Sequence, residues 1–376
     1  MNNSIQYKAK KKNVLIIVGS YWPDISGGGL QVRLLSKFLK RFYNFYFLTT
    51  TTNNSLKSSK KIFRIYYKKN LIVFFLNTIK LLLFFFLKFY KYDIIYIRGF
   101  TKKIALIIIL GKIFNKYLIY SPTRYQEDDL LTIKRKKPLI FLLFYLIDKF
   151  LNINNSFFQL NYFNNKSIKV NCYVDCHKFK PSLRNNKIPK ILAVGFFSKI
   201  KNTRLTYLVW RDLFLKGIKS NITFAGKFYS DYYLQDNDIY DFIKQDSIKN
   251  SIYQHIKVLG EVKDMSKLYK KSDIFVLPSE TEGFANSILE AMSSKNAVII
   301  TNSKYINTQF THGIDCFKIK KNSYSEYSNY LEKLITKRNL RKKLSENAYR
   351  HVKNEFDIRN KNVLYKLEKV FTPKSR

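Results

Sequence analysis

The stretch between residues 273 and 301 constrains the fold of this chain more than any other. It opens with the apolar run 273–277, which reads as a buried strand, and closes with a second such run at 297–301. A short helix that starts near Ala285 fits between the two runs. Because two strands that are joined through a helix run parallel, the stretch predicts an α/β fold with a parallel sheet.

Two acids, Glu282 and Glu290, lie on either side of the junction between the loop and the helix. Glu282 falls in the loop at the C-terminal edge of the predicted sheet, and Glu290 lies about two turns into the helix. The first amides of a helix lack intrahelical partners, and the helix dipole favours an anion there. An anion site between two acids suits a nucleotide-sugar. The alternative is a capped helix that carries two solvated acids.

The sequence of residues 278–292 resembles the motif of two glutamates, separated by seven residues, of retaining glycosyltransferases, specifically glycosyltransferase family 4. Further stretches that resemble segments of this family lie at residues 21–29, 171–181, 190–202 and 258–273. The resemblance implies the GT-B architecture, in which two doubly wound Rossmann-like domains face each other across a cleft. It also implies retaining sugar transfer from a nucleotide-sugar donor, with no cofactor and no bound metal.

The resemblance assigns roles to residues of the motif and to one lysine outside it. Glu282 would contact the donor sugar and is the catalytic candidate, Glu290 would bind the ribose, and Lys201 would neutralise the diphosphate. The first amides of the helix would also hold the diphosphate, and they belong to Phe284, Ala285, Asn286 and Ser287. For Lys201 the alternative is one solvated lysine among many.

A glycine-rich segment, Gly27 and Gly28 followed by Gly29, lies in the predicted loop 19–29. Glycines there would let the backbone approach a ligand closely, and the resemblance makes that ligand the donor. The alternative is a flexible surface turn. The helix that follows is predicted from Leu30 to Leu39.

The sequence departs from the family pattern at two places. Phe196 stands where the family usually has Arg, so either another basic residue such as Lys199 compensates, or donor affinity is weak, or the donor differs. The family also often carries a His near residues 121–129, and none is present here. The candidates for acceptor or sugar contacts in that segment are Arg124, Glu127 and Asp128. The alternative is a solvated charged loop.

The alternation of strands and helices predicts two domains and a closing helix. Residues 1–183 would form an N-terminal, acceptor-side Rossmann-like domain, and residues 184–355 a C-terminal, nucleotide-sugar-binding one. A polar linker at 181–189 separates them. Residues 356–376 are expected as a helix that crosses back to the first domain, as the resemblance implies.

The chain is strongly basic, with a formal net charge of +42, and residues 1–170 hold 30 Lys and Arg but only 6 Asp and Glu. Nucleic acid, anionic lipid and small anions are the usual partners of such a surface. No nucleic-acid-binding motif is visible, so no nucleic-acid partner is expected. Residues 71–87 are mostly apolar and are bracketed by lysines, which favours a helix at an anionic membrane surface. The alternative is a helix wholly buried in the domain core.

A transmembrane span is less favoured, because Lys80 lies near the middle of that apolar stretch and a strand follows at once. The start of the chain is polar and lysine-rich, so no signal peptide is expected. The three cysteines lack the spacing of a metal site and are expected to be free thiols. The expected location is the cytoplasm, peripheral on the inner face of the cytoplasmic membrane.

The sequence therefore predicts a retaining glycosyltransferase that uses a nucleotide-sugar and acts on a lipid-linked or cell-envelope saccharide. A second hypothesis is a catalytically weak or inactive GT-B relative that works as a membrane-associated partner in polysaccharide assembly. Phe196 and the missing His support the second hypothesis, whereas Glu282, Glu290 and Lys201 argue against it.

Overall fold

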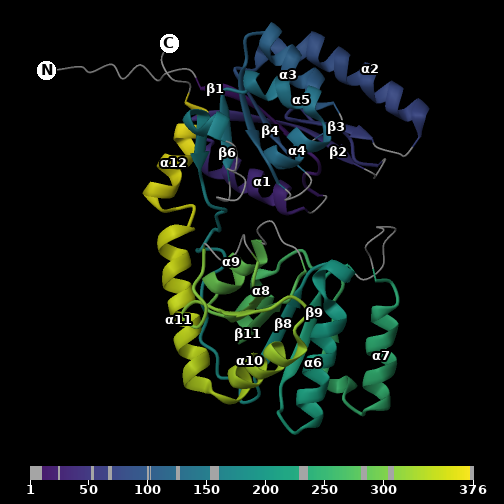
Figure 1. The fold of residues 1–376 in the computed structure, drawn as a ribbon, viewed down its shortest axis with the longest axis vertical. Helices are drawn as coiled ribbons and strands as arrows, with labels where there is room; N and C mark the ends of the chain where they lie inside the picture. Colours follow the sequence, from purple (N-terminus) through teal and green to yellow (C-terminus); the bar gives the residue numbers. More distant parts are fainter. Residues whose placement is uncertain are drawn as a thin grey trace, which may run out of the picture. The chain divides into compact units, whose positions relative to one another are not determined.

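The structure is a computed structural model, and it describes residues 11–372 except 24–25, 52–54, 67–69, 100, 102, 124–127, 153–160, 228–235, 281–285 and 304–308. The chain forms two compact units (Figure 1). The first unit comprises residues 1–171 and 361–376, and the second comprises residues 172–360.

The first unit is built on a sheet of seven parallel strands in the order β3-β2-β1-β4-β5-β6-β7. The strands are β1 (Lys12–Val18), β2 (Tyr43–Thr51), β3 (Ile62–Tyr66), β4 (Ile94–Arg98), β5 (Tyr117–Ser121), β6 (Lys149–Asn152) and β7 (Ser167–Lys169). The central strands β1, β4 and β5 are almost wholly buried, as their continuous apolar runs require in a sheet that is covered on both faces.

Helices cover both faces of this sheet. They are α1 (Gly27–Leu39), α2 (Leu71–Lys88), α3 (Ile104–Ile113), α4 (Leu130–Lys136), α5 (Pro138–Leu143) and α12 (Lys361–Phe371), with the 3-10 turns η1 (Phe89–Lys91), η2 (Phe144–Leu146) and η4 (Asn161–Lys166). Strand order reverses between β1 and β4, so right-handed crossovers put α1 on one face and α2, α3 and α5 on the other. Helix α12 joins the face of α1.

The closing helix α12 packs against the first sheet through Phe371. The ring of Phe371 lies 5.6 Å from that of Tyr43, 6.2 Å from Phe45 and 5.6 Å from Tyr96, measured between centroids. The sequence predicted a helix from residue 356, but α12 begins at Lys361. Residues 356–360 form a turn instead, in which Asp357 makes an isolated β-bridge with Val174.

The second unit holds a sheet of six parallel strands in the order β10-β9-β8-β11-β12-β13. The strands are β8 (Lys190–Val194), β9 (Asn221–Ala225), β10 (Ile256–Val258), β11 (Ile274–Leu277), β12 (Ala297–Thr301) and β13 (Phe317–Ile319). The helices are α6 (Thr203–Leu215), α7 (Ile239–Lys249), α8 (Ser266–Lys271), α9 (Asn286–Ser293), α10 (Tyr324–Thr336) and α11 (Arg338–Glu355), with the turns η5 (Lys199–Lys201) and η6 (Tyr253–His255). Trp210, Tyr207, Tyr269 and Tyr327 are the largest fully buried side chains in its described part.

The compact units divide at 171/172 and 360/361, whereas the sequence placed the boundaries at 183/184 and 355/356. Residues 172–183 lie with the second unit because they are bonded to it. The β-bridge at Val174 is one such bond, and buried Asp175 accepts a hydrogen bond of 2.9 Å from Nε of Arg359. The Ser293 hydroxyl also donates to the carbonyl of Phe179 at 2.7 Å. The predicted polar linker is held as well, because the Ser182 hydroxyl and Nε of Arg184 donate to the carbonyl of Lys270 at 2.7 and 3.0 Å.

Helix α2 is buried on one side and exposed on the other. Asn77, Leu81, Phe84 and Phe85 recur three or four positions apart and form the stripe that packs on the sheet. Most of its other side chains are exposed and apolar, so the expectation of a wholly buried core helix is wrong. Within the ranges that the structure describes, no helix is both long enough and apolar enough to cross a bilayer.

Candidate functional site

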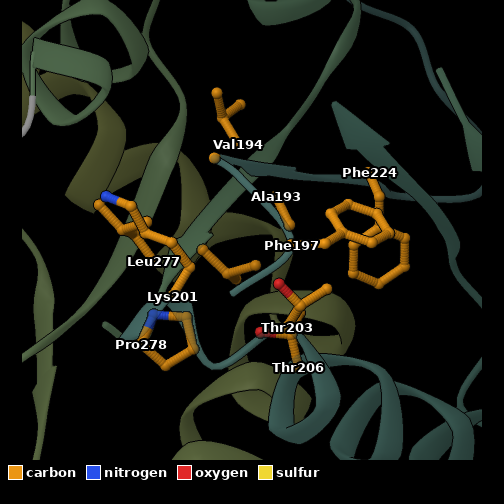
Figure 2. A pocket seen from close by; sticks show the side chains of 11 residues that line it. Ala193, Val194, Phe197, Lys201, Thr203, Thr206, Phe224, Leu277 and Pro278 are labelled. Atoms are coloured by element: carbon orange, nitrogen blue, oxygen red, sulfur yellow. The ribbon is translucent and has the colours of Figure 1, made fainter. Parts of the chain in front are cut away.

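The strand order of the second unit reverses between β8 and β11, which makes their C-terminal ends the expected ligand edge of this sheet. A small pocket lies there (Figure 2). Its lining includes Val194 and Gly195 after β8, Leu277 and Pro278 after β11, and the side chain of Lys201. The pocket therefore joins the segment that carries the candidate lysine to the strand that precedes Glu282.

Lys201 owes its position to Gly195. Gly195 has φ of +148°, and its N–H donates to the carbonyl of Ala225 at 3.0 Å. A Cβ atom at Gly195 would lie only 3.2 Å from the stem of Lys201, which passes directly over the glycine. A side chain at position 195 would therefore be strained and would displace the lysine.

Hydrogen bonds fix the turn that contains Lys201. The backbone N–H of Lys201 donates to the Ser198 hydroxyl, and Asn202 adopts a left-handed conformation with φ of +56°. The amide of Asn202 donates to Asn322 at 2.7 Å, and Asn322 donates to Glu280 at 3.3 Å. This chain of side chains joins the segment after β8 to the segment after β11, so both ligand-edge segments are held in one arrangement.

Helix α9 begins at Asn286, one residue after the expected start. Asn286 and Ser287 are its first two residues, so their amides belong to the turn that favours an anion. Glu282, Phe284 and Ala285 lie outside the described residues.

Glu290 lies in the second turn of α9 and is only partly exposed. Burial raises its pKa from 4.5 to about 7, while the Tyr269 hydroxyl and the charge of Lys178 oppose that rise. Tyr269 is fully buried, and among the described residues no group meets its hydroxyl at full hydrogen-bond geometry. A partly desolvated carboxylate beside a buried hydroxyl is suited to bind ligand hydroxyl groups.

The glycines of the first unit form the first turn of a helix, where the sequence predicted a loop. Ser26 caps α1, and its hydroxyl accepts a hydrogen bond of 3.0 Å from the N–H of Gly29. A Cβ at Gly29 would lie 2.5 Å from the carbonyl oxygen of Ser20, so this position requires glycine. Gly27 and Gly28 therefore present helix amides, not a flexible turn.

Asp128 is buried and engaged within its own loop. Its carboxylate accepts hydrogen bonds from the N–H of Thr123 at 2.9 and 3.0 Å and from the Thr123 hydroxyl at 2.6 Å. Its carbonyl accepts a bond of 2.7 Å from the hydroxyl of Tyr120. These contacts fix the loop after β5, so Asp128 is not a solvated acid, as the alternative had it. Arg124 and Glu127 lie outside the described residues.

Arg98 is a residue of this region that the sequence reasoning missed. It ends β4, it is only 6% exposed, and its Nη1 donates to the hydroxyl of Tyr96 at 2.9 Å. Its Nε lies 3.7 Å from where a Cβ of Gly28 would be, so the guanidinium adjoins the start of α1. The signal was available, because an arginine that closes an apolar strand at the switch between β1 and β4 is unusual.

Phe196 follows the pocket residue Gly195 and is 49% exposed. We expect Phe196→Arg to strengthen the binding of a nucleotide-sugar about fivefold to tenfold, because a guanidinium pairs with phosphate oxygens in a bidentate manner. Calorimetry with wild type and variant would measure the change. Phe196→Lys is the control for charge without the planar fork. Unchanged affinity in the Arg variant would show that another cation already fills this role.

Residues 177–351, nearly all of the second unit, match the model of the family "Glycosyl transferases group 1". The second unit belongs to this family. The group 1 domain thus contains the pocket, Lys201 and Glu290.

Two relatives are similar to parts of the chain. The "Capsular polysaccharide biosynthesis glycosyltransferase CapM" of Staphylococcus aureus is 25% identical over 188 residues, 47% of this chain and 47% of that protein. The "UDP-Gal:alpha-D-GlcNAc-diphosphoundecaprenol alpha-1,3-galactosyltransferase" of Escherichia coli is 31% identical over 108 residues, 29% of this chain and 28% of that protein. The chain therefore spans about half or less of the length of these relatives.

The likeness in structure extends over both units. The crystal structure of a glycosyltransferase from Rickettsia africae ESF-5 has a TM-score of 0.72, with 21% identity over 97% of this chain and 100% of that chain. At this identity the likeness shows the fold. The two Rossmann-like domains of the GT-B class, and the family resemblance of the group 1 domain, are confirmed as the sequence predicted them.

Proposed function

We propose that this chain transfers a sugar from a nucleotide-sugar donor to a saccharide of the cell envelope, with retention of the anomeric configuration. One observation carries the proposal. Lys201 lines a pocket at the ligand edge of a group 1 glycosyltransferase domain, and helix α9, which carries Glu290, follows β11 at the same edge. A cation, helix amides and a carboxylate of raised pKa are the groups that a nucleoside diphosphate with a ribose needs.

In this proposal the charge that develops on the leaving diphosphate is neutralised by Lys201. The amides of residues 284–287 add hydrogen bonds to the same oxygens, where an anion is stabilised most in the transition state. Glu290 accepts hydrogen bonds from the ribose hydroxyls, and Glu282 contacts the donor sugar. Transfer is expected without a bound metal, so an excess of EDTA should leave the rate unchanged, and a rate that EDTA abolishes would contradict this mechanism.

The acceptor is proposed to be a lipid-linked saccharide. The name of the Escherichia coli relative includes a diphosphoundecaprenol-linked sugar, and that of CapM includes capsular polysaccharide. The first unit would hold this acceptor, and the helix amides of Gly27 and Gly28 would approach the donor. The reaction would take place at the cytoplasmic face of the membrane.

The experiment begins with the donor. Thermal-shift measurements with UDP-, GDP- and ADP-sugars select the nucleotide that stabilises the chain most, since a ligand that binds the native state raises the melting temperature. Transfer of that sugar to a polyprenyl-diphosphate saccharide is then measured, and NMR of the product gives its anomeric configuration. Transfer with inversion would overturn the proposed mechanism.

A second candidate is a catalytically weak GT-B protein that serves as a partner in polysaccharide assembly. The exposed Phe196 beside the pocket favours it, because a phenyl ring cannot pair with phosphate. Donor binding without turnover, on any of the acceptors tested, would support this candidate over the first.

A further inference from the structure

The first unit carries an apolar surface that its own fold does not cover. It lies on α2 with η1, on α3, and on α5 with η2, and we call it the α2–α3–α5 face. More than half of the large apolar side chains that are exposed in the described part of the chain belong to these elements. Phe86 of α2 is 77% exposed, Ile113 of α3 is 70%, and Leu139 of α5 is 80%.

These elements form one continuous face. Helices α2, α3 and α5 lie on the same side of the first sheet, as the reversal of strand order requires (Figure 1). Nζ of Lys103, which precedes α3, donates to the Thr78 hydroxyl of α2 at 2.7 Å. The rings of Phe89 and Phe114 pack 5.6 Å apart where α2 and α3 end, and α3 packs against α5. Exposed apolar residues on three adjoining helices make a patch far larger than isolated surface residues do.

The exposed side of α2 is too broad to be explained by packing within the unit. Phe75, Ile79, Leu82 and Phe86 are spaced three or four apart, opposite the stripe that contacts the sheet. Leu82 and Phe85, which look alike in the sequence, therefore differ: Leu82 faces outward and Phe85 is buried. A helix that is apolar on its inner and on its outer side is most stable with apolar surroundings on both sides.

The charges of the same elements indicate what covers the face. Residues 71–91, 104–116 and 130–146 contain nine Lys and Arg and no Asp or Glu. Lys80, Lys88 and Lys91 are exposed, and so is the run from Lys134 to Lys137. One of the nine, Lys112, is paired with Asp148 at 2.7 Å. Interfaces between proteins are poor in lysine, whereas anionic headgroups attract it.

We propose that the α2–α3–α5 face docks on a bilayer that contains anionic lipid. The exposed phenylalanine and leucine side chains enter the boundary between headgroups and acyl chains, and the lysines bind the headgroup phosphates. Asn77, Leu81 and Phe85 keep α2 attached to its own sheet, so the helix lies along the membrane plane. This inference does not rest on the proposed sugar transfer.

Vesicle flotation of the full chain, without donor or acceptor, tests the proposal. The chain should bind vesicles of phosphatidylcholine with phosphatidylglycerol more tightly than vesicles of phosphatidylcholine alone. Added salt should weaken the binding to anionic vesicles, because exposed charges are screened over a distance of about 10 Å at moderate ionic strength. Monomeric, folded protein that ignores anionic vesicles at low salt would overturn the proposal.

Two matched sets of variants locate the surface. The triple change Phe75→Ser, Leu83→Ser and Phe86→Ser should weaken vesicle binding at least about tenfold, since insertion of even one such side chain is worth that much. The control set, Leu215→Ser, Ile248→Ser and Tyr253→Ser, replaces exposed apolar residues of the second unit and should change nothing. Unaltered melting temperatures would show that both sets fold. Equal loss in the two sets would overturn the proposal.

Two matched sets of lysine variants distinguish a lipid surface from a protein partner. Lys80→Gln, Lys88→Gln and Lys91→Gln should weaken binding to anionic vesicles about tenfold or more and leave binding to neutral vesicles unchanged. Lys216→Gln, Lys249→Gln and Lys337→Gln are the control for lost charge elsewhere. Sedimentation velocity tests the remaining possibility, that a second copy of the chain binds to this face. A dimer that the serine variants abolish, without any vesicle binding in the wild type, would show a self-association surface and overturn the lipid assignment.

Discussion

Replacing Lys201 with Met should lower the rate of sugar transfer by about a hundredfold or more, with little change in the melting temperature. Removal of one preorganised group that stabilises the charge of a transition state typically costs about that much. Methionine keeps the length of the side chain, so the stem still packs over Gly195 and the turn after β8 retains its support. The loss should therefore appear in kcat, which single-turnover kinetics with saturating donor would measure.

Lys199 provides the control, because it lies two positions away in the same turn and is exposed. Lys199→Met should retain nearly the full rate. If Lys199→Met were as damaging as Lys201→Met, the summed positive charge of the turn, and not Lys201 specifically, would support transfer. Full activity in Lys201→Met would remove Lys201 from the donor site.

The parallel sheets could be predicted from the sequence because continuous apolar runs allow few other interpretations. The runs at 273–277 and 297–301 became β11 and β12, two interior strands of the second sheet. Three short strands at or next to an edge of the first sheet were not predicted. Strands β6 and β7 lie in a region that reads as turn-rich asparagine sequence, and β3 follows a polar loop. At a sheet edge the pairing partner, not local propensity, decides whether a few residues are extended.

The candidate site shows a similar limit. The spacing of Glu290 after β11 was readable, but the burial that raises its pKa, and Tyr269 of α8 that opposes this rise, depend on packing that the sequence does not show. Asp128 was a candidate for ligand contacts, with a solvated loop as the alternative, and the structure shows it hydrogen-bonded to Thr123 and Tyr120. Arg98 looked like the end of a strand, yet it adjoins the start of α1. Each of these outcomes depends on which residues of other elements face the group.

The amphipathic character of α2 could be predicted in part. Lysines around an apolar run indicated a helix near a surface, but the run is apolar on every side, so its period could not tell which residues face the sheet. The stripe of Asn77, Leu81 and Phe84 emerged only from packing, in which Asn77 also donates a hydrogen bond of 2.6 Å to the carbonyl of Tyr66. The participation of α3 and α5 in the same face could not be anticipated, because it follows from the order of the strands.

Replacing Glu290 with Gln should weaken the binding of the nucleotide-sugar by about 1–3 kcal/mol, or about 5-fold to 150-fold, the range for a lost hydrogen bond to a charged group. The wild-type affinity should also fall as the pH decreases below about 7, because protonation of this carboxyl removes an acceptor for the ribose hydroxyls. Calorimetry between mildly acidic and alkaline pH would show both effects. A nucleotide-sugar is a better probe than a free nucleotide, because the terminal phosphate of a free nucleotide titrates in the same pH range, near pH 6.

The same carboxyl gives a matching test in the free protein. Because burial raises the pKa of Glu290 from 4.5 to about 7, the folded chain binds more protons than the unfolded chain between these values. Its contribution to stability is therefore complete below pH 4.5 and is lost as the pH rises through about 7, by at most about 3 kcal/mol.

Glu290→Gln should flatten this part of the stability curve. Tyr269→Phe removes a hydroxyl that lowers the pKa, so it should move the midpoint upward. A wild-type curve without a change between pH 4.5 and 7, together with unaltered nucleotide affinity in Glu290→Gln, would exclude Glu290 from the donor site.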